Sequence, residues 1–346
     1  MFHFFRIIRI IIDTNQQVGL PKISDNFSIA RTNRHNSHFS TPFSESSDVS
    51  FSSIIAYIEC MEKRRKKGMN PLTTTLLDTS KGIVEFTYKG SGPPVLLLKG
   101  GHSTRDTDLS HSSLIYEGFS LLTISRPGYD YTELSTGRTP EDFADTIVEV
   151  LDHLQLEKVN VISISAAGPT GIALAVHHPD RVARLLLEAA LLTSWEGDVK
   201  KRAALLFGPA EKFVWSSLRT MLKFFPDLVL KQLLADLTTE NVEDYLDNLT
   251  PNDRRFIVDM LATSQSGKGF ITDLDHETPD INGLQVPVLG MYSQKDRSVP
   301  YTNALLLKSS VPDCEIFEVD SDSHLIWIGK DAHTVWKKRL EFLTNT

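Results

Sequence analysis

Residues 159–168 read Val-Asn-Val-Ile-Ser-Ile-Ser-Ala-Ala-Gly, a run rich in β-branched residues that gives way to small ones. The run predicts a buried strand, and a helix-like stretch follows, so Ser165 falls at a tight strand-to-helix turn. Such a turn leaves no room for bulky side chains two positions either side of the serine, and Ser163 and Ala167 meet that demand. Val161 would flank Ser163 in the same way, which argues against Ser163 at the turn. Ser165 therefore has the setting of a nucleophile elbow, or that of an ordinary helix N-cap.

The composition is that of an ordinary globular protein. The 346 residues are 41% hydrophobic and 23% charged, enough for one large core or two smaller ones. The net charge of −8 argues against nucleic acid as a partner, because phosphate binding needs a basic face. Cys60 and Cys314 form no disulfide framework and lack metal-site spacing, so a reducing compartment is the simplest interpretation.

Residues 1–68 differ from the rest of the chain. An apolar run at 2–12 is broken by two arginines and is too short to span a bilayer. Residues 13–53 are rich in Ser, Asn and Thr, and a short helix with a basic end follows at 54–67. We expect a largely disordered tail and a cytoplasmic protein. Membrane contact or organellar targeting through this segment is the alternative.

Strand and helix patterns alternate from about residue 73 to residue 190. Apolar runs that end in turn residues predict strands, and Thr139-Pro140 is a strong helix start. Strands buried on both faces and separated by helices indicate a parallel sheet wrapped by helices. The predicted strands here are 83–88, 95–98, 121–125, 159–164 and 182–187.

The pattern changes after Glu188. Residues 191–274 show helical stripes, an aromatic cluster and no strand, which predicts a helical cap inserted into the sheet domain. Strand patterns return at 286–292 and 315–319, and a helix closes the chain. The expected core is therefore residues 69–190 together with 275–346.

An acid and a base follow Ser165 in the chain. A serine nucleophile needs a base to take its proton and a third group to orient that base. Asp296 and His324 each stand in a loop directly after a predicted strand, where an open α/β sheet places its site. Glu188, at the end of an earlier strand, is a rival acid. Five other histidines fit the expected chain position less well: His102, His111, His177, His178 and His333.

Acyl chemistry also needs hydrogen-bond donors for the oxyanion. The backbone N–H of Ala166, next to the serine, is one candidate. The N–H of Gly101, in the loop after an early strand, is the second, although Gly100-Gly101 also reads as a plain turn. For Arg126 we favour a structural ion pair over a place at the pocket entrance.

From about Thr73 onward the chain resembles the α/β-hydrolase superfamily. The resemblance is carried by 96–102 (Leu-Leu-Leu-Lys-Gly-Gly-His), 125–129 (Ser-Arg-Pro-Gly-Tyr), 163–169, 323–329 and the strand leading to Asp296. It implies an α/β fold with a mostly parallel eight-stranded sheet flanked by helices and a lid between the sixth and seventh strands. By that likeness Ser165, Asp296 and His324 are nucleophile, orienting acid and base.

The chain departs from the superfamily pattern at several positions. Lys99 stands where histidine is usual, and this leaves the geometry of the oxyanion loop open. Ser163 and Ala167 replace common glycines in the elbow, and Asp130 replaces a frequent glycine.

These features predict a serine hydrolase that cleaves an ester or related acyl bond of a small, partly apolar molecule through an acyl-enzyme. No metal or cofactor is implied. A serine at the elbow argues against epoxide hydrolase and haloalkane dehalogenase chemistry, which needs a carboxylate there. The alternatives are a C–C or amide hydrolase of aminopeptidase type with the same triad, and a non-catalytic ligand-binding protein on the same fold.

Overall fold

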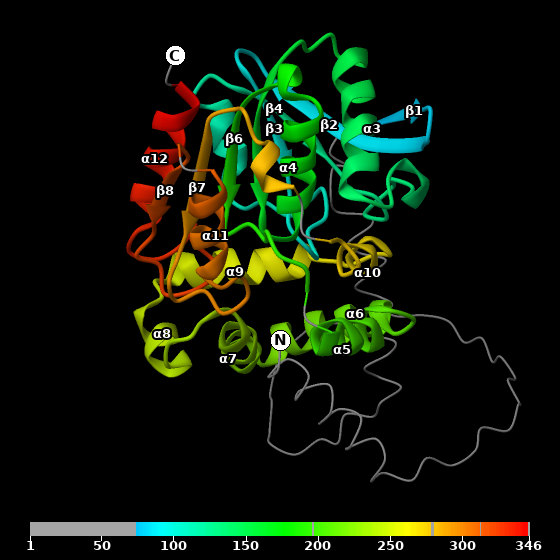
Figure 1. Cartoon of the computed structure of the whole chain (residues 1–346). Helices are drawn as coiled ribbons and strands as arrows, with labels where there is room; N and C mark the ends of the chain where they lie inside the picture. The colour runs from blue at the N-terminus through cyan, green and yellow to red at the C-terminus, as the bar shows by residue number, and fades with distance from the viewer. Residues whose placement is uncertain (1–73, 196, 278–279, 312, 345–346) are drawn as a thin grey trace, which may run out of the picture. The chain divides into compact units, whose positions relative to one another are not determined.

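A computed structural model of the chain describes residues 74–195, 197–277, 280–311 and 313–344 (Figure 1). The tail and the basic helix predicted within residues 1–68 lie outside these ranges.

One eight-stranded sheet organises the described residues. Its spatial order is β1-β2-β4-β3-β5-β6-β7-β8, and β2 runs antiparallel to both β1 and β4 while the other pairs are parallel. The predicted mostly parallel, helix-flanked sheet is therefore confirmed. The strands are β1 (Thr75–Thr79), β2 (Gly82–Gly90), β3 (Pro94–Leu98), β4 (Ser120–Ile124), β5 (Val159–Ile164), β6 (Val182–Glu188), β7 (Val288–Tyr292) and β8 (Glu315–Glu318).

Helices connect the parallel strands. Figure 1 shows α3 (Pro140–His153), α4 (Gly168–His177) and α11 (Thr302–Ser310) in front of the sheet. The Thr139 side chain caps α3 by accepting a hydrogen bond from the Asp142 N–H, with Pro140 at the first helical position as predicted. The chain closes with α12 (Ala332–Thr344). Short 3-10 turns complete the core: η1 (His111–Ile115), η2 (Leu134–Thr136), η3 (Ser165–Ala167), η4 (Pro179–Arg181) and η5 (Ile281–Gly283).

Six helices lie between β6 and β7, at one end of the sheet (Figure 1). They are α5 (Gly197–Phe207), α6 (Glu211–Phe224), α7 (Pro226–Leu237), α8 (Val242–Asn248), α9 (Pro251–Thr263) and α10 (Gly269–Asp273). A capping box between Thr250 and Asp253 fixes the start of α9. We refer to α5–α10 as the cap; the exact limits of 191 and 274 stay a prediction.

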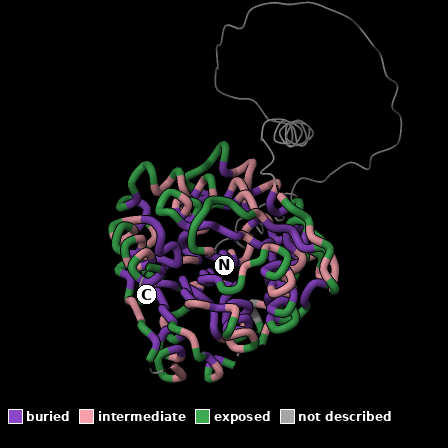
Figure 2. Tube along the Cα trace, turned by 90° about the horizontal axis from the view of Figure 1, so that it is seen from above, coloured by how far each residue is buried: buried purple, intermediate pink, exposed green. Residues whose placement is uncertain are grey.

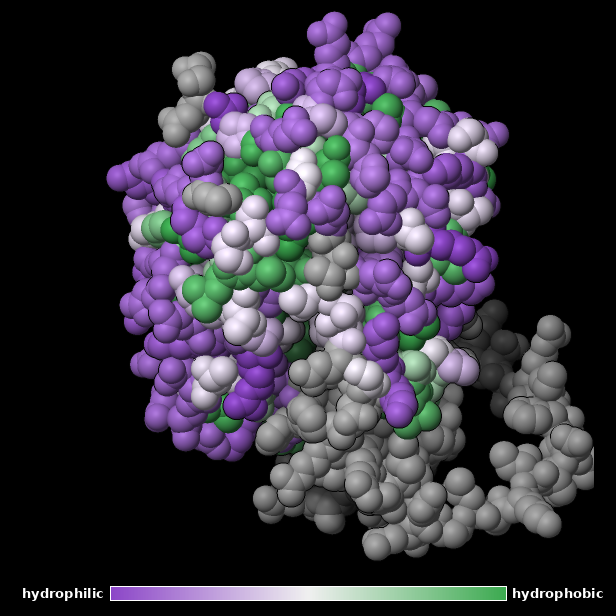
Figure 3. All heavy atoms as spheres, viewed as in Figure 1, coloured by the Kyte–Doolittle hydropathy of each residue, from purple (hydrophilic) through white to green (hydrophobic). Residues whose placement is uncertain are grey.

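The central strands form the interior. Every residue of β5 and β7 is buried, and Figure 2 shows such buried stretches surrounded by exposed loops and helix faces. The face in Figure 3 is mainly hydrophilic, with hydrophobic side chains gathered over part of it. The aromatic cluster read from the cap sequence divides in two: Phe207 and Trp215 are buried, whereas Phe213, Phe224 and Phe225 are exposed. Only the first pair can therefore shape an internal site.

None of the helices within the described ranges combines the length and the apolar character that crossing a membrane requires.

Candidate active site

Ser165 lies at the junction between β5 and α4, in the turn η3. Its φ is 50°, a left-handed conformation that is uncommon for a residue with a side chain and costs on the order of 1–3 kcal/mol. The turn is crowded: a Cβ added to Gly100 would lie 2.9 Å from the Ser165 Cβ, and one added to Gly171 would lie 1.9 Å from the Ser163 Oγ. Small residues are therefore required at positions 100 and 171, beside the elbow.

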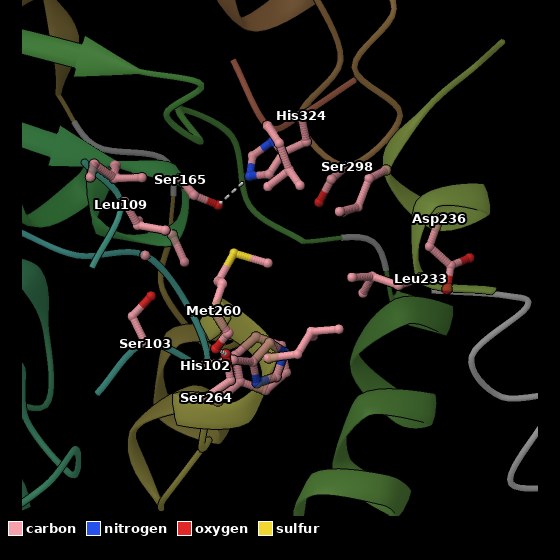
Figure 4. A pocket seen from close by; sticks show the side chains of 18 of the residues that line it. His102, Ser103, Leu109, Ser165, Leu233, Asp236, Met260, Ser264, Ser298 and His324 are labelled. Atoms are coloured by element: carbon pink, nitrogen blue, oxygen red, sulfur yellow. Dashed lines mark hydrogen bonds between the residues drawn. The ribbon is translucent and has the colours of Figure 1, made fainter. Parts of the chain in front are cut away.

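The structure brings Ser165, His324 and Asp296 into one hydrogen-bonded series. Figure 4 shows the contact between Ser165 and His324 as a dashed line. The His324 Nε2 lies 3.1 Å from the Ser165 Oγ, and the His324 Nδ1 lies 2.6 Å from the Asp296 Oδ2. With the Nδ1–H donated to the carboxylate, Nε2 is left to accept the serine proton. Asp296 is 2% exposed, so its charge has little water around it.

A second contact fixes the carboxylate of Asp296. The Val299 N–H donates to the Asp296 Oδ1 at 2.8 Å, so each carboxylate oxygen has its own donor.

The cap contacts both the loop that carries Asp296 and the loop that carries His324. The carbonyl of Leu237, at the end of α7, accepts the His324 N–H at 2.9 Å and the Arg297 N–H at 3.3 Å. The position of this carbonyl was not predictable from the sequence, because it depends on how the cap packs onto the core.

The rival acid Glu188 is engaged elsewhere. Its carboxylate accepts hydrogen bonds from the Arg339 Nε at 2.7 Å, the Trp327 Nε1 at 2.5 Å and the His111 Nε2 at 2.9 Å. Burial alone would raise the pKa of Glu188, but the Arg339 guanidinium and His111 hold it well below its ordinary value. Glu188 therefore anchors Trp327 and α12, and it is Asp296 that contacts His324.

Gly101 and Ala166 lie side by side at the cavity. A Cβ added to Gly101 would lie 3.6 Å from the Ala166 Cβ and 3.1 Å from the Phe270 ring. Both residues line the same cavity as the Ser165 hydroxyl. This neighbourhood suits two N–H groups that converge on one oxygen.

Lys99 points away from the cavity and braces the loop that follows it. Its Nζ donates to the carbonyls of Thr104, Arg105 and Thr107 at 3.0, 2.9 and 2.6 Å. Burial lowers the pKa of Lys99 to about 8. The Lys99 carbonyl in turn accepts the Arg126 Nε–H at 2.8 Å. Lysine at this position thus stabilises the loop through hydrogen bonds to three of its carbonyl groups.

Arg126 forms a buried ion pair across the core and the cap. Its Nη1 and Nη2 donate to the two Asp273 oxygens at 2.5 and 2.8 Å, and the Tyr129 hydroxyl donates to Asp273 at 2.6 Å. Because Asp273 belongs to α10, this pair ties the cap to the loop after β4. Asp130, which follows Tyr129, has φ 48°, consistent with a position where glycine is common.

The cavity in front of Ser165 has a volume of about 320 Å³. Its wall is mainly apolar and comes from core loops and cap helices together, including Leu109, Phe207, Trp215, Leu233, Met260 and Trp327. Within the described residues no group of three or more His, Cys, Asp or Glu side chains is arranged to hold a metal ion. Sequence patterns could not identify the cap residues of this wall, because helical stripes do not reveal which face turns inward.

Comparisons with known proteins agree with this fold. The family model described as alpha/beta hydrolase fold matches residues 93–329. The uncharacterized hydrolase YcgS of Bacillus subtilis is 32% identical over 270 residues, covering 76% of this chain and 95% of YcgS. A 2-hydroxy-6-oxononadienedioate/2-hydroxy-6-oxononatrienedioate hydrolase of Pseudomonas putida is 23% identical, covering 74% of this chain and 86% of its own.

Among solved structures, an alpha/beta hydrolase fold protein from Nakamurella multipartita superposes with a TM-score of 0.68 at 24% identity. The match covers 78% of this chain and 99% of that one. At this identity the likeness supports the fold.

Proposed function

The chain belongs to the α/β-hydrolase family and is a hydrolase, and we propose that it is a serine hydrolase that cleaves ester or related acyl bonds of small molecules. The observation that carries the proposal is the unbroken series from the Ser165 Oγ through His324 to Asp296, with separations of 3.1 and 2.6 Å. A serine hydroxyl becomes a competent nucleophile when a neutral, oriented imidazole can take its proton.

The proposed reaction has two steps. The Ser165 Oγ attacks the substrate carbonyl while the His324 Nε2 takes its proton, and Asp296 stabilises the imidazolium that results. His324 then gives the proton to the leaving alcohol as the carbonyl–oxygen bond breaks. Water, activated by the same imidazole, hydrolyses the acyl-enzyme and restores Ser165. The N–H groups of Gly101 and Ala166 stabilise the oxyanion in both steps.

The wall of the cavity supports a small and partly apolar substrate. Aromatic and aliphatic side chains from core and cap surround the volume of about 320 Å³. The same triad would also serve a C–C or an amide bond. The name of the Pseudomonas putida relative, 2-hydroxy-6-oxononadienedioate/2-hydroxy-6-oxononatrienedioate hydrolase, specifies no ester bond, so a C–C bond is the alternative substrate bond.

Covalent labelling tests the proposal. We expect a fluorophosphonate probe to label Ser165 and the protein to hydrolyse p-nitrophenyl esters, with both lost in Ser165→Ala. Ser163→Ala is the matched control, since Ser163 is fully buried two residues away and its Oγ has no hydrogen-bond partner within the described part of the chain. Turnover that survives Ser165→Ala, or ligand binding without any label on Ser165, would contradict the proposal. A panel of C–C and amide substrates then separates the bond types.

A further inference from the structure

A second histidine, His102, lies in the cavity wall and takes no part in the triad (Figure 4). In Figure 4 it lies on the opposite side of the cavity from His324. Its ring is packed between aromatic rings, with centroid separations of 3.8 Å to Phe270, 4.5 Å to Phe207 and 5.4 Å to Trp215. The ring is thereby held in one orientation.

One ring nitrogen of His102 belongs to a short buried hydrogen-bond chain. The Trp215 Nε1–H donates to the Ser266 Oγ at 2.8 Å, and the Ser266 Oγ lies 2.7 Å from the His102 Nδ1. Ser266 is 0% exposed, and these two groups are the hydrogen-bond partners of its hydroxyl among the described residues.

The position of the His102 proton follows from counting hydrogens along this chain. An indole N–H is a donor only, so the Ser266 oxygen accepts from Trp215 and has one proton of its own to give. Among the described residues, that proton has a single available acceptor, the His102 Nδ1. Were Nδ1 protonated instead, the serine proton would be buried without an acceptor, at a cost of about 1–3 kcal/mol. Nδ1 is therefore unprotonated and Nε2 carries the hydrogen.

The ring is also uncharged. A protonated ring would need a proton on Nδ1, which the serine hydroxyl opposes. Burial, with a further contribution from the charge of Arg126, lowers the pKa of His102 to about 3.

The His102 Nε2 is an accessible atom of a side chain that lines the cavity. Within the described residues, two histidine ring nitrogens are both buried and without a hydrogen-bond partner: the Nδ1 atoms of His111 and His276. The His102 Nε2 is not among them, so it is not a buried atom without a partner. No protein acceptor bonds to it in those ranges, and His102 lines the cavity. A neutral donor therefore faces a mainly apolar part of the wall, to which Ser103 and Ser264 also contribute.

We propose that His102 is a substrate-binding residue whose Nε2–H donates to an uncharged acceptor oxygen of the substrate, such as a ketone, ether or second ester oxygen, away from the scissile bond. The inference rests on the proposed function in taking this cavity as the substrate site. A substrate ammonium group would find no acceptor at a protonated nitrogen. A carboxylate would lose its hydration without gaining a countercharge from this neutral ring. The group that fits at His102 is thus one additional neutral oxygen of an ester substrate.

The test measures binding, so it does not depend on turnover. In the Ser165→Ala background, tryptophan fluorescence would report the dissociation constants of 4-phenyl-2-butanone and butylbenzene, a matched pair with and without the carbonyl. Trp195 and Trp215 line the cavity and serve as reporters. His102→Phe keeps an aromatic ring but removes the donor. We expect it to raise the ratio of the ketone dissociation constant to the hydrocarbon dissociation constant about five- to tenfold. An unchanged ratio would overturn the inference, and so would a failure of the ketone to bind the Ser165→Ala protein in which His102 is unchanged.

A spectroscopic measurement covers the case in which His102→Phe does not fold. Nitrogen-15 NMR of the full chain labelled at histidine distinguishes the two neutral tautomers. The inference requires His102 in the Nε2–H form at pH 7, and a change of that signal in Ser266→Ala. An Nδ1–H tautomer would overturn it. Failure of the proposed hydrolysis would appear separately, as absence of label on Ser165 while the ketone still binds.

Discussion

We expect Asp296→Asn to remove most of the turnover while leaving the fold intact, because of how the two carboxylate oxygens are used. The Val299 N–H requires an acceptor at the Oδ1 position, at 2.8 Å. An asparagine satisfies it only by placing its carbonyl oxygen there, which directs its NH₂ group at the His324 Nδ1. That nitrogen must then accept, so the ring proton moves to Nε2, and Nε2 can no longer take the Ser165 proton. The loss of a productive tautomer costs on the order of 10⁴ in kcat in a serine triad.

The assay is steady-state hydrolysis of a short p-nitrophenyl ester at neutral pH. We expect kcat to fall by about 10³ to 10⁴ with KM little changed, since the cavity wall is untouched. Glu188→Gln is the matched comparison: it alters the other carboxylate at a strand end and should reduce stability far more than kcat of the folded enzyme. A kcat of Asp296→Asn within tenfold of the unaltered enzyme, combined with a large loss in folded Glu188→Gln, would refute the assignment of the acid.

Two further predictions concern stability. Asp273→Asn breaks the buried pair with Arg126, and we expect the free energy of unfolding in urea to fall by about 3–5 kcal/mol; a change below 1 kcal/mol would contradict the idea that this pair ties the cap to the core. Burial lowers the pKa of Lys99 to about 8, below its value in the unfolded chain, so the unfolded state binds more protons between about pH 8 and 10. The free energy of unfolding of the unaltered protein, minus that of Lys99→Met, should therefore rise over that range. If the difference between their urea midpoints stays flat or falls while the m value is constant, Lys99 stays charged.

Local patterns predicted most of the sheet because most of its strands contain buried apolar residues and are bounded by turn residues. β1 is the exception. Strands β2 to β8 were predicted from the sequence pattern, whereas the presence of one more strand was implied only by the resemblance. Leu76 in β1 is 53% exposed, and the strand pairs with β2 alone at the edge of the sheet. With so little burial there is little hydrophobic signal to read.

Chain order and strand ends pointed to Ser165, Asp296 and His324, but the cavity could not be read in the same way. Its wall depends on contacts between distant segments, such as His102 with Ser266, which are 164 residues apart. Nothing in the local pattern around Ser266 indicates that its hydroxyl fixes a histidine tautomer. Such pairs are set by how the cap packs on the core, and a single sequence records only that each partner is polar.

The choice between Glu188 and Asp296 also depends on contacts between distant segments, in this case on which charged groups surround each carboxylate. Glu188 ends β6 and Asp296 follows the neighbouring strand β7, so the positions at strand ends alone left the two acids open. Both are buried in the structure. Their partners separate them. Glu188 is matched by the permanent charge of Arg339, so its negative charge is already neutralised within the fold. Within the described part of the chain, the Asp296 carboxylate has only the Val299 N–H and the His324 ring as partners, so its charge remains available when the ring becomes an imidazolium. A carboxylate already paired with a fixed cation stabilises such a transient charge less, and the difference in partners therefore favours Asp296 as the orienting acid.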